Sequence, residues 1–304
     1  MLLDSTRPIG KTLNTSNGRP ETSAGVLPQW HVLRATYARE LKVQDQLREH
    51  GIRTFIPMTW HKSDPATGKQ QKTLNVVKDK YDCVVRIKPE ERNIFLVFTA
   101  DSMFQGGEKI LKTLKKNRIK GSFFFTGNAL RLEELKETIE KIIKEGHYVG
   151  GHSDSHMLYA EWNNRDSLIV TPQQIADDII ANAKELEKFG ISKEESLWFL
   201  PPYEWYNEVS VRVTEKLGYK VINFTPGTGT SDDYTTPAMA NYKSSQQLID
   251  RLYAFEHAQG LNGAVILIHP GIHEDRIDRL YDRLAEVILY LTKKGYSFKS
   301  LNEI

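Results

Sequence analysis

One cysteine, no long apolar run and almost no net charge exclude several classes of protein. Cys83 is the single cysteine among 304 residues, so no disulfide can form within the chain. No stretch is apolar for long enough to cross a membrane, and residues 1–4 lack the basic start and apolar core of a signal peptide. The sequence as given therefore predicts a cytoplasmic protein, whereas a non-native start would leave the periplasm or cell envelope open.

The charge pattern says little in favour of a nucleic-acid partner. The formal net charge is +2, and the basic residues exceed the acidic ones only modestly near the start of the chain. Such an excess is more typical of a solvated basic surface than of a polyanion-binding face.

Three regions of different composition follow one another. Residues 1–29 are rich in Ser, Thr, Gly and Pro, which predicts a disordered segment. Residues 30–80 read as a small β-α-β segment. In residues 81–304, short apolar runs alternate with amphipathic stretches, which predicts an α/β domain of parallel strands joined by helices, either a barrel or an open sheet.

The predicted elements of the third region place polar residues at shared positions. We expect strands at 93–99, 121–126, 197–200, 220–224 and 264–269, and helices at 108–116, 130–145, 173–189, 209–217, 245–256 and 275–294. Asp101, His152, Tyr203 and His269 all fall just after predicted strands. Catalytic groups of (β/α) barrels lie at these strand ends, so the placement predicts one common site.

His152 and His156 are the strongest candidates for metal ligands. Two histidines four residues apart point the same way from one helical turn, so their imidazoles can share an ion. Gly150 and Gly151 before them indicate a short strand and a turn. A catalytic zinc usually takes three protein ligands and keeps one position for water, so a third ligand is needed.

Residues 82–304 resemble the NodB-type polysaccharide deacetylases, carbohydrate esterase family four. The resemblance is carried by the segments His152-Ser-Asp-Ser-His156, Val265-Ile-Leu-Ile-His269, Lys120-Gly-Ser-Phe-Phe-Phe-Thr-Gly127 and Tyr290 to Leu301. It implies a distorted (β/α) barrel and a metal-dependent hydrolase that removes N- or O-linked acetyl groups from a glycan or polysaccharide. It also implies one divalent metal, usually zinc with cobalt or nickel as alternatives, held here by Asp101, His152 and His156.

The same resemblance assigns roles at the acetyl group. His269 is expected to protonate the leaving group, and a backbone N–H near Tyr203 to hold the tetrahedral oxyanion with the metal. Glu204 and Trp205 follow Tyr203, and we expect all three at the mouth of the site, in contact with sugar. A packed loop is the alternative for these aromatic residues, and also for Tyr159 and Trp162.

Two family positions are replaced in this chain. The family has two adjacent aspartates, a base and a metal ligand, where this chain has Ala100-Asp101. The ungapped register makes Ala100 the missing base, and the register shifted by one residue makes Asp101 the base and Ser102 the ligand, which is disfavoured because serine is a poor zinc ligand. Leu200 replaces the arginine that holds the base, so the pair is lost together.

Three explanations of the missing base stay open. A metal-bound hydroxide suffices, or a nearby carboxylate (Glu204, Asp232 or Asp233) takes over, or the domain is a non-catalytic, metal-containing glycan-binding protein. Asp154 is a poor substitute because it lies two residues from each histidine and would point away on a helical turn.

The segment from Trp30 to about residue 77 resembles the first half of a NusG amino-terminal domain, as in the UpxY-type antitermination factors. Trp30-His-Val-Leu-Arg-Ala-Thr36 and Gly51-Ile-Arg-Thr-Phe-Ile-Pro57 carry the likeness. Half a domain lacks a complete core, which favours a fusion remnant or a cloning artefact. An ordinary β-α-β cap on the barrel is an equal alternative. A module that binds RNA polymerase, in an antitermination-related fusion, is the minor alternative.

Overall fold

The computed structural model describes residues 74–304, a compact unit that begins at Leu74. The predicted disordered segment 1–29 and the NusG-like segment up to residue 73 lie outside these residues. The unit begins before the domain start predicted at residue 81, because its first strand pairs with the strand that follows. No helix in residues 74–304 is both long and apolar enough to span a membrane.

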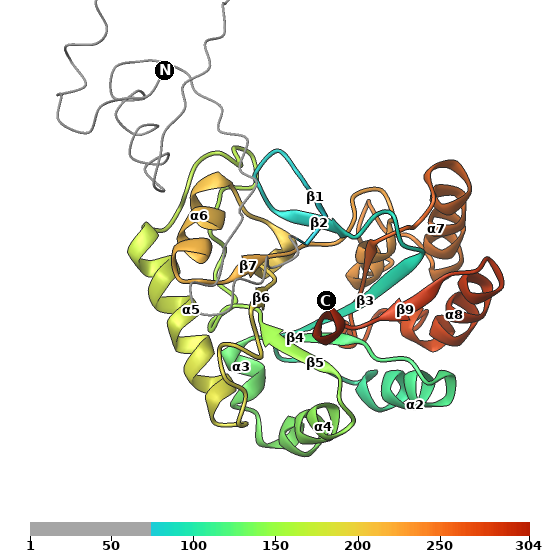
Figure 1. The fold of residues 1–304 in the computed structure, drawn as a ribbon, viewed down its shortest axis with the longest axis horizontal. Helices are drawn as coiled ribbons and strands as arrows, with labels where there is room; N and C mark the ends of the chain where they lie inside the picture. Colours follow the sequence, from blue (N-terminus) through green and yellow to red (C-terminus); the bar gives the residue numbers. More distant parts are fainter. Residues whose placement is uncertain (1–73) are drawn as a thin grey trace, which may run out of the picture. The chain divides into compact units, whose positions relative to one another are not determined.

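The described unit alternates strands and helices around one curled sheet (Figure 1). The strands are β1 (Val76–Lys78), β2 (Val84–Ile87), β3 (Asn93–Ala100), β4 (Ser122–Phe125), β5 (Tyr148–Gly151), β6 (Trp198–Phe199), β7 (Lys220–Val221), β8 (Ala264–Ile268) and β9 (Ser297–Lys299). The α-helices are α2 (Gly107–Asn117), α3 (Gly127–Leu130), α4 (Glu133–Lys144), α5 (Pro172–Glu187), α6 (Glu208–Lys216), α7 (Ser245–Gln259) and α8 (Leu284–Lys293). Short 3-10 turns are η2 (Pro202–Glu204), η3 (Thr230–Tyr234), η4 (Leu280–Arg283) and η5 (Leu301–Glu303).

The sheet follows the order β1-β2-β8-β3-β4-β5-β6-β7, with β9 added beside the start of β3. The strands from β8 to β7 run parallel, while β1 and β2 are antiparallel to their neighbours. A parallel bridge between Val84 of β2 and Ile222, just after β7, curls the sheet back on itself. The predicted distorted (β/α) barrel is therefore confirmed.

Strand β3 shows how the sequence separates the two cores. Successive side chains of a strand point to opposite faces. Leu96, Phe98 and Ala100 pack in the cluster that the helices cover, whereas Phe95 and Val97 pack in the cluster inside the barrel. Every residue of β3 is buried, as expected for a central parallel strand covered on both faces.

Two predicted helices differ from the structure. The helix expected at 130–145 is divided, because Thr126 caps the short α3 by accepting a hydrogen bond from the Ala129 N–H, and α4 starts anew at Glu133. The helix expected at 275–294 begins only at Leu284. The segment before it turns inward to bury Arg276, whose guanidinium donates to the backbone oxygens of Thr235 and Lys243.

Candidate active site

Three of the predicted residues meet at the carboxyl ends of the strands. His152 follows β5, Glu204 lies in the η2 turn after β6, and His269 follows β8. The Glu204 carboxylate lies between the two imidazoles, with Oε1 3.8 Å from His152 Nε2 and Oε2 4.0 Å from His269 Nε2. The shared edge expected from the strand pattern therefore brings two imidazoles and one carboxyl together.

His152 is fixed in one tautomer by the backbone. Its Nδ1 donates to the carbonyl oxygen of Leu200 at 2.7 Å, and the side chain is almost fully buried. Burial, reinforced by the charge of His156, lowers the pKa of His152 well below its usual value. The neutral ring therefore presents the lone pair of Nε2 to the site, which is the arrangement that a metal ligand needs.

His156 reaches the same place from a loop rather than from a helix. The two ring centroids are 5.1 Å apart, but Ser153 and His156 both have left-handed backbones, with φ of 72° and 55°. The expected helical turn is therefore wrong. The Ser153 hydroxyl accepts a hydrogen bond from the His156 N–H at 2.9 Å, which closes a tight turn that brings the rings together.

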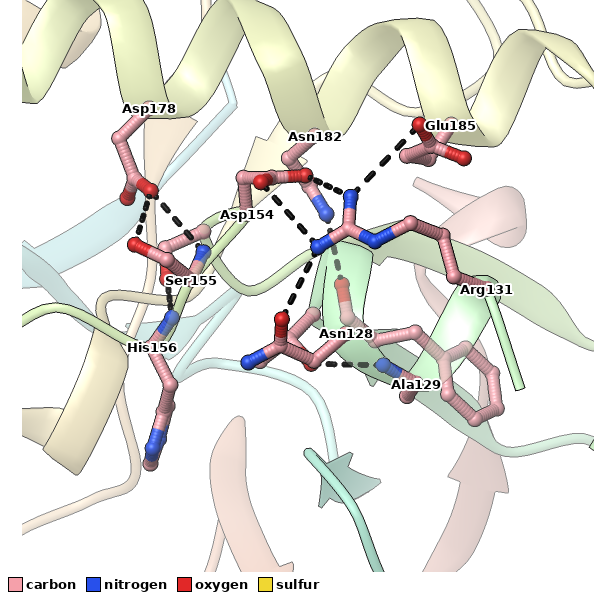
Figure 2. A network of polar contacts seen from close by, with 12 residues as sticks. Asn128, Ala129, Arg131, Asp154, Ser155, His156, Asp178, Asn182 and Glu185 are labelled. Atoms are coloured by element: carbon pink, nitrogen blue, oxygen red, sulfur yellow. Dashed lines mark hydrogen bonds and ion pairs between the residues drawn. The ribbon is translucent and has the colours of Figure 1, made fainter.

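Helices α3 and α5 hold this loop through a polar network (Figure 2). Asp178 of α5 accepts hydrogen bonds from the Ser155 N–H at 3.0 Å, the Ser155 hydroxyl at 2.8 Å and the Tyr159 hydroxyl at 2.7 Å. Asp154 pairs with Arg131 at 2.6 Å. Asp154 is thus engaged outside the histidine pair, so it is no substitute base.

Asp101 does not complete a metal site with the two histidines. Its Oδ1 accepts hydrogen bonds from the Thr126 hydroxyl at 2.8 Å and from the Asn128 amide at 3.1 Å. Within residues 74–304, no group of three or more His, Cys, Asp or Glu side chains is gathered closely enough to hold a metal ion. The residues therefore fit a metal only in part, through two histidines, and no catalytic step can be derived through it.

The position of the missing base also differs from the prediction. Ala100 packs in the core beneath the helices and is not part of the site. Because side chains alternate along β3, its neighbour Thr99 faces the barrel interior and lies beside Glu204. The Thr99 hydroxyl is buried and has no hydrogen-bond partner among the described residues. Thr99, rather than Ala100, therefore stands next to Glu204.

Asp233 of η3 positions His269. One carboxylate oxygen accepts a hydrogen bond from the His269 N–H at 3.0 Å, and the other accepts one from Nδ1 at 2.6 Å. Burial lowers the pKa of His269, but the charge and hydrogen bond of Asp233, with the charge of Glu204, outweigh it and raise the pKa to about 8. The imidazolium therefore persists at neutral pH, and its Nε2–H faces Glu204.

Of the three predicted substitute carboxylates, only Glu204 faces the histidines without already serving another group. Asp233 is committed to His269, and Asp232 pairs with Arg251 at 2.6 Å. Burial raises the pKa of Glu204, and the charge of His269 opposes that rise. Tyr203 and Glu204 also have left-handed backbones, with φ of 57° and 53°, a strained conformation that is found mostly at functional sites.

Comparison with known proteins finds similarity to polysaccharide deacetylases. The family model described as polysaccharide deacetylase matches residues 86–222. Over this stretch the chain is similar to the polysaccharide deacetylases. Among these proteins, the chain is similar to PdaA of Bacillus subtilis, named a peptidoglycan-N-acetylmuramic acid deacetylase, with 29% identity over 79% of this chain and 80% of PdaA.

Solved structures support the deacetylase fold. The structure of Bacillus subtilis PdaA has 26% identity and a TM-score of 0.56, over 74% of this chain and 85% of PdaA. BA3943, described as a CE4 family pseudoenzyme from Bacillus anthracis, has 20% identity and a TM-score of 0.57, over 72% of this chain and 67% of BA3943. A family 4 acetyl xylan esterase from Clostridium thermocellum, in complex with a cobalt ion, has 19% identity and a TM-score of 0.55, over 69% of this chain and 89% of the esterase.

Proposed function

We propose that this chain hydrolyses N-acetyl groups on the amino sugars of a peptidoglycan-type glycan, with Glu204 as general base and His269 as general acid. The observation that carries the proposal is the Glu204 carboxylate between the Nε2 atoms of His152 and His269. The named activity of PdaA supports the substrate class. O-linked acetyl groups are the second candidate substrate, because the same two groups could hydrolyse an ester.

The two groups divide the proton transfers between them. Glu204 removes a proton from water as its oxygen attacks the acetyl carbonyl, and a tetrahedral intermediate forms. His269 then donates its Nε2 proton to the amide nitrogen while the carbon–nitrogen bond breaks. Acetate and the free amine leave. The proton held by Glu204 then passes to His269, which returns both side chains to their starting states. Asp233 keeps His269 in the required orientation, because it holds both Nδ1 and the backbone N–H.

A divalent cation, zinc before cobalt or nickel, is part of this proposal. The free Nε2 of His152 and the adjacent ring of His156 supply two nitrogen ligands, and the cobalt complex of the Clostridium thermocellum esterase supports a metal in this fold. When bound, the ion would polarise the acetyl carbonyl. Asp101 is the third candidate ligand, with its Oδ1 held by Thr126 and Asn128.

The variant Glu204→Gln tests the assignment of the base. The amide keeps the size of the side chain but accepts no proton, so acetate release from N-acetylated chito-oligosaccharides or peptidoglycan fragments should fall by about a hundredfold or more. Glu194→Gln, at an exposed position, is the matched control and should behave as wild type. Acetate is measured with added zinc and with a chelator. Unchanged activity in Glu204→Gln would show that another group is the base.

A non-catalytic glycan-binding protein is the second candidate. It is favoured by Thr99 and Ala100 at the end of β3, where no carboxylate lies, and by the lack of a three-ligand cluster in residues 74–304. This candidate predicts that the wild-type chain binds acetylated oligosaccharides and releases no acetate under any metal condition. The same assay therefore separates the two functions.

A further inference from the structure

Three aromatic side chains line the rim of the site beside His156. We name Trp162, Tyr203 and Trp205 the aromatic platform. The Tyr203 ring lies 4.2 Å from the His156 ring, and the Trp162 ring lies 5.6 Å from Tyr203 and 5.4 Å from Trp205, centroid to centroid. Trp162 is 55% exposed and Tyr203 is 42% exposed. The platform thus leads continuously from the catalytic groups to the surface.

Hydrogen bonds add to the ring contacts that hold the platform in place. Trp162 lies on a turn that is closed by an antiparallel bridge between Ala160 and Leu168. The Trp205 indole N–H donates to the Glu161 carbonyl oxygen at 3.2 Å, which ties this turn to η2. The exposure of Trp162 is therefore a fixed feature of the rim.

Arg165 adds a second tie between the turn and the rest of the rim. Its guanidinium lies 4.2 Å from the Trp205 ring centroid and 4.5 Å from those of Tyr81 and Tyr206, and its Nε donates to the Tyr206 carbonyl oxygen at 2.5 Å. This cation is consequently occupied by aromatic faces and a carbonyl.

The chemistry of the turn favours an uncharged ligand with an apolar face. The exposed amides of Asn163 and Asn164 lie next to Trp162, and the exposed carboxylates of Glu161 and Asp166 make the turn unfavourable for a polyanion. A pyranose ring has an apolar C–H face and a rim of hydroxyl groups. The indole face suits the first, and the amides can hydrogen-bond the second.

We infer that Trp162 forms a saccharide subsite for the sugar next to the one that reacts, so that the ligand is a glycan chain of at least two units. The intervening Tyr203 ring separates Trp162 from His156, so one sugar residue cannot occupy both places. The inference deepens the proposed function and rests on it for the position of the reacting sugar. The occupant is a neutral oligosaccharide, with its ring stacked on the indole.

Binding of chitotetraose and of N-acetylglucosamine to the full chain, measured by calorimetry, tests the subsite. Trp162→Ala should weaken chitotetraose binding about tenfold and leave the monosaccharide affinity unchanged. Trp162→Phe should restore most of the affinity. Leu289→Ala is the control, because Leu289 is an exposed apolar residue on α8 with 54% exposure, and it should bind as wild type. Glu204→Gln should retain tetramer binding.

Each outcome decides the inference. Chitotetraose binding that is equally tight in Trp162→Ala, or absent in the wild type, would overturn the subsite. Equal weakening of the tetramer and the monosaccharide would also overturn it, because Trp162 would then touch the reacting sugar or act through the fold. Trp162-dependent tetramer binding without acetate release would sustain the subsite and contradict the proposed hydrolysis.

Discussion

His269 and Glu204 are both mostly buried, with side chains 15% and 14% exposed, yet their surroundings act differently on their pKa values. Burial disfavours the charged form of either group. For His269 the adjacent Asp233 reverses this effect, and its pKa rises to about 8. For Glu204 burial prevails over the opposing charge of the more distant His269, and its pKa is raised. An imidazolium that stays protonated at neutral pH, beside a carboxyl whose pKa is raised, is the acid and base pair that the proposed hydrolysis uses.

Asp233→Asn should lower the pKa of His269. The folded-state pKa of about 8 lies above the ordinary value of 6.5, so the stabilisation from this pair is fully present below about 6.5 and is lost as the pH rises through 8. An amide keeps a hydrogen bond but removes the negative charge. The alkaline limb of kcat/KM should therefore move from about pH 8 toward lower pH.

The His269 titration followed by NMR checks this independently of turnover. Asp232→Asn is the matched control, because Asp232 pairs with Arg251 and should leave the titration where it is. An unchanged midpoint in Asp233→Asn would mean that the charge of Asp233 does not control His269.

At the scale of elements, the periodicity of apolar residues predicted the bounds of those strands and helices that local sequence controls. The bounds of β3, α2 and β8 agree with the sequence to within a residue. The alternation along β3 was available from sequence as well, but the register against the family motif placed Ala100 in the site instead of Thr99. The histidine pair was misjudged because its spacing fits a helix, whereas left-handed Ser153 and His156 depend on contacts made by distant helices.

Helix α5 provides the contact that matters most for this loop. Asp177→Ala and Asp178→Ala change neighbouring residues, one exposed and one buried. Loss of the Asp178 carboxylate leaves the Ser155 N–H and the Tyr159 hydroxyl without their acceptor, which should cost about 1–3 kcal/mol of unfolding free energy. It should also lower kcat, because the loop that carries His156 loses its anchor.

Urea denaturation and acetate release measure both effects, and Asp177→Ala should stay within about 0.5 kcal/mol of wild type. A Asp178→Ala variant as stable and active as the control would contradict the anchoring role.

At the scale of the whole molecule, the sequence predicted the barrel architecture better than the residue at which the barrel begins. Alternating strands and helices indicated a barrel, and polar residues after strands indicated the edge where His152, Glu204 and His269 meet. Strand β1 lies before the start predicted at residue 81, and its pattern in the sequence is weak because it is short and mostly exposed. Strand β1 joins the barrel by pairing with β2, and the Asp79 carboxylate just after it accepts a hydrogen bond from Tyr206, in the loop before α6. No local sequence pattern reveals these two contacts.

Two fragments, 74–304 and 81–304, test where this unit begins. The first retains β1 and Asp79, whose carboxylate accepts hydrogen bonds from the Tyr206 hydroxyl at 2.8 Å and the Cys83 N–H at 3.1 Å. The second loses these bonds and the packing of Val76 against the barrel core, so its free energy of unfolding should be lower by about 2–4 kcal/mol. Circular dichroism melts measure the difference. Equal melting temperatures for the two fragments would show that the unit begins at residue 81, and a fragment 74–304 that fails to fold would show that residues 1–73 contribute to its core.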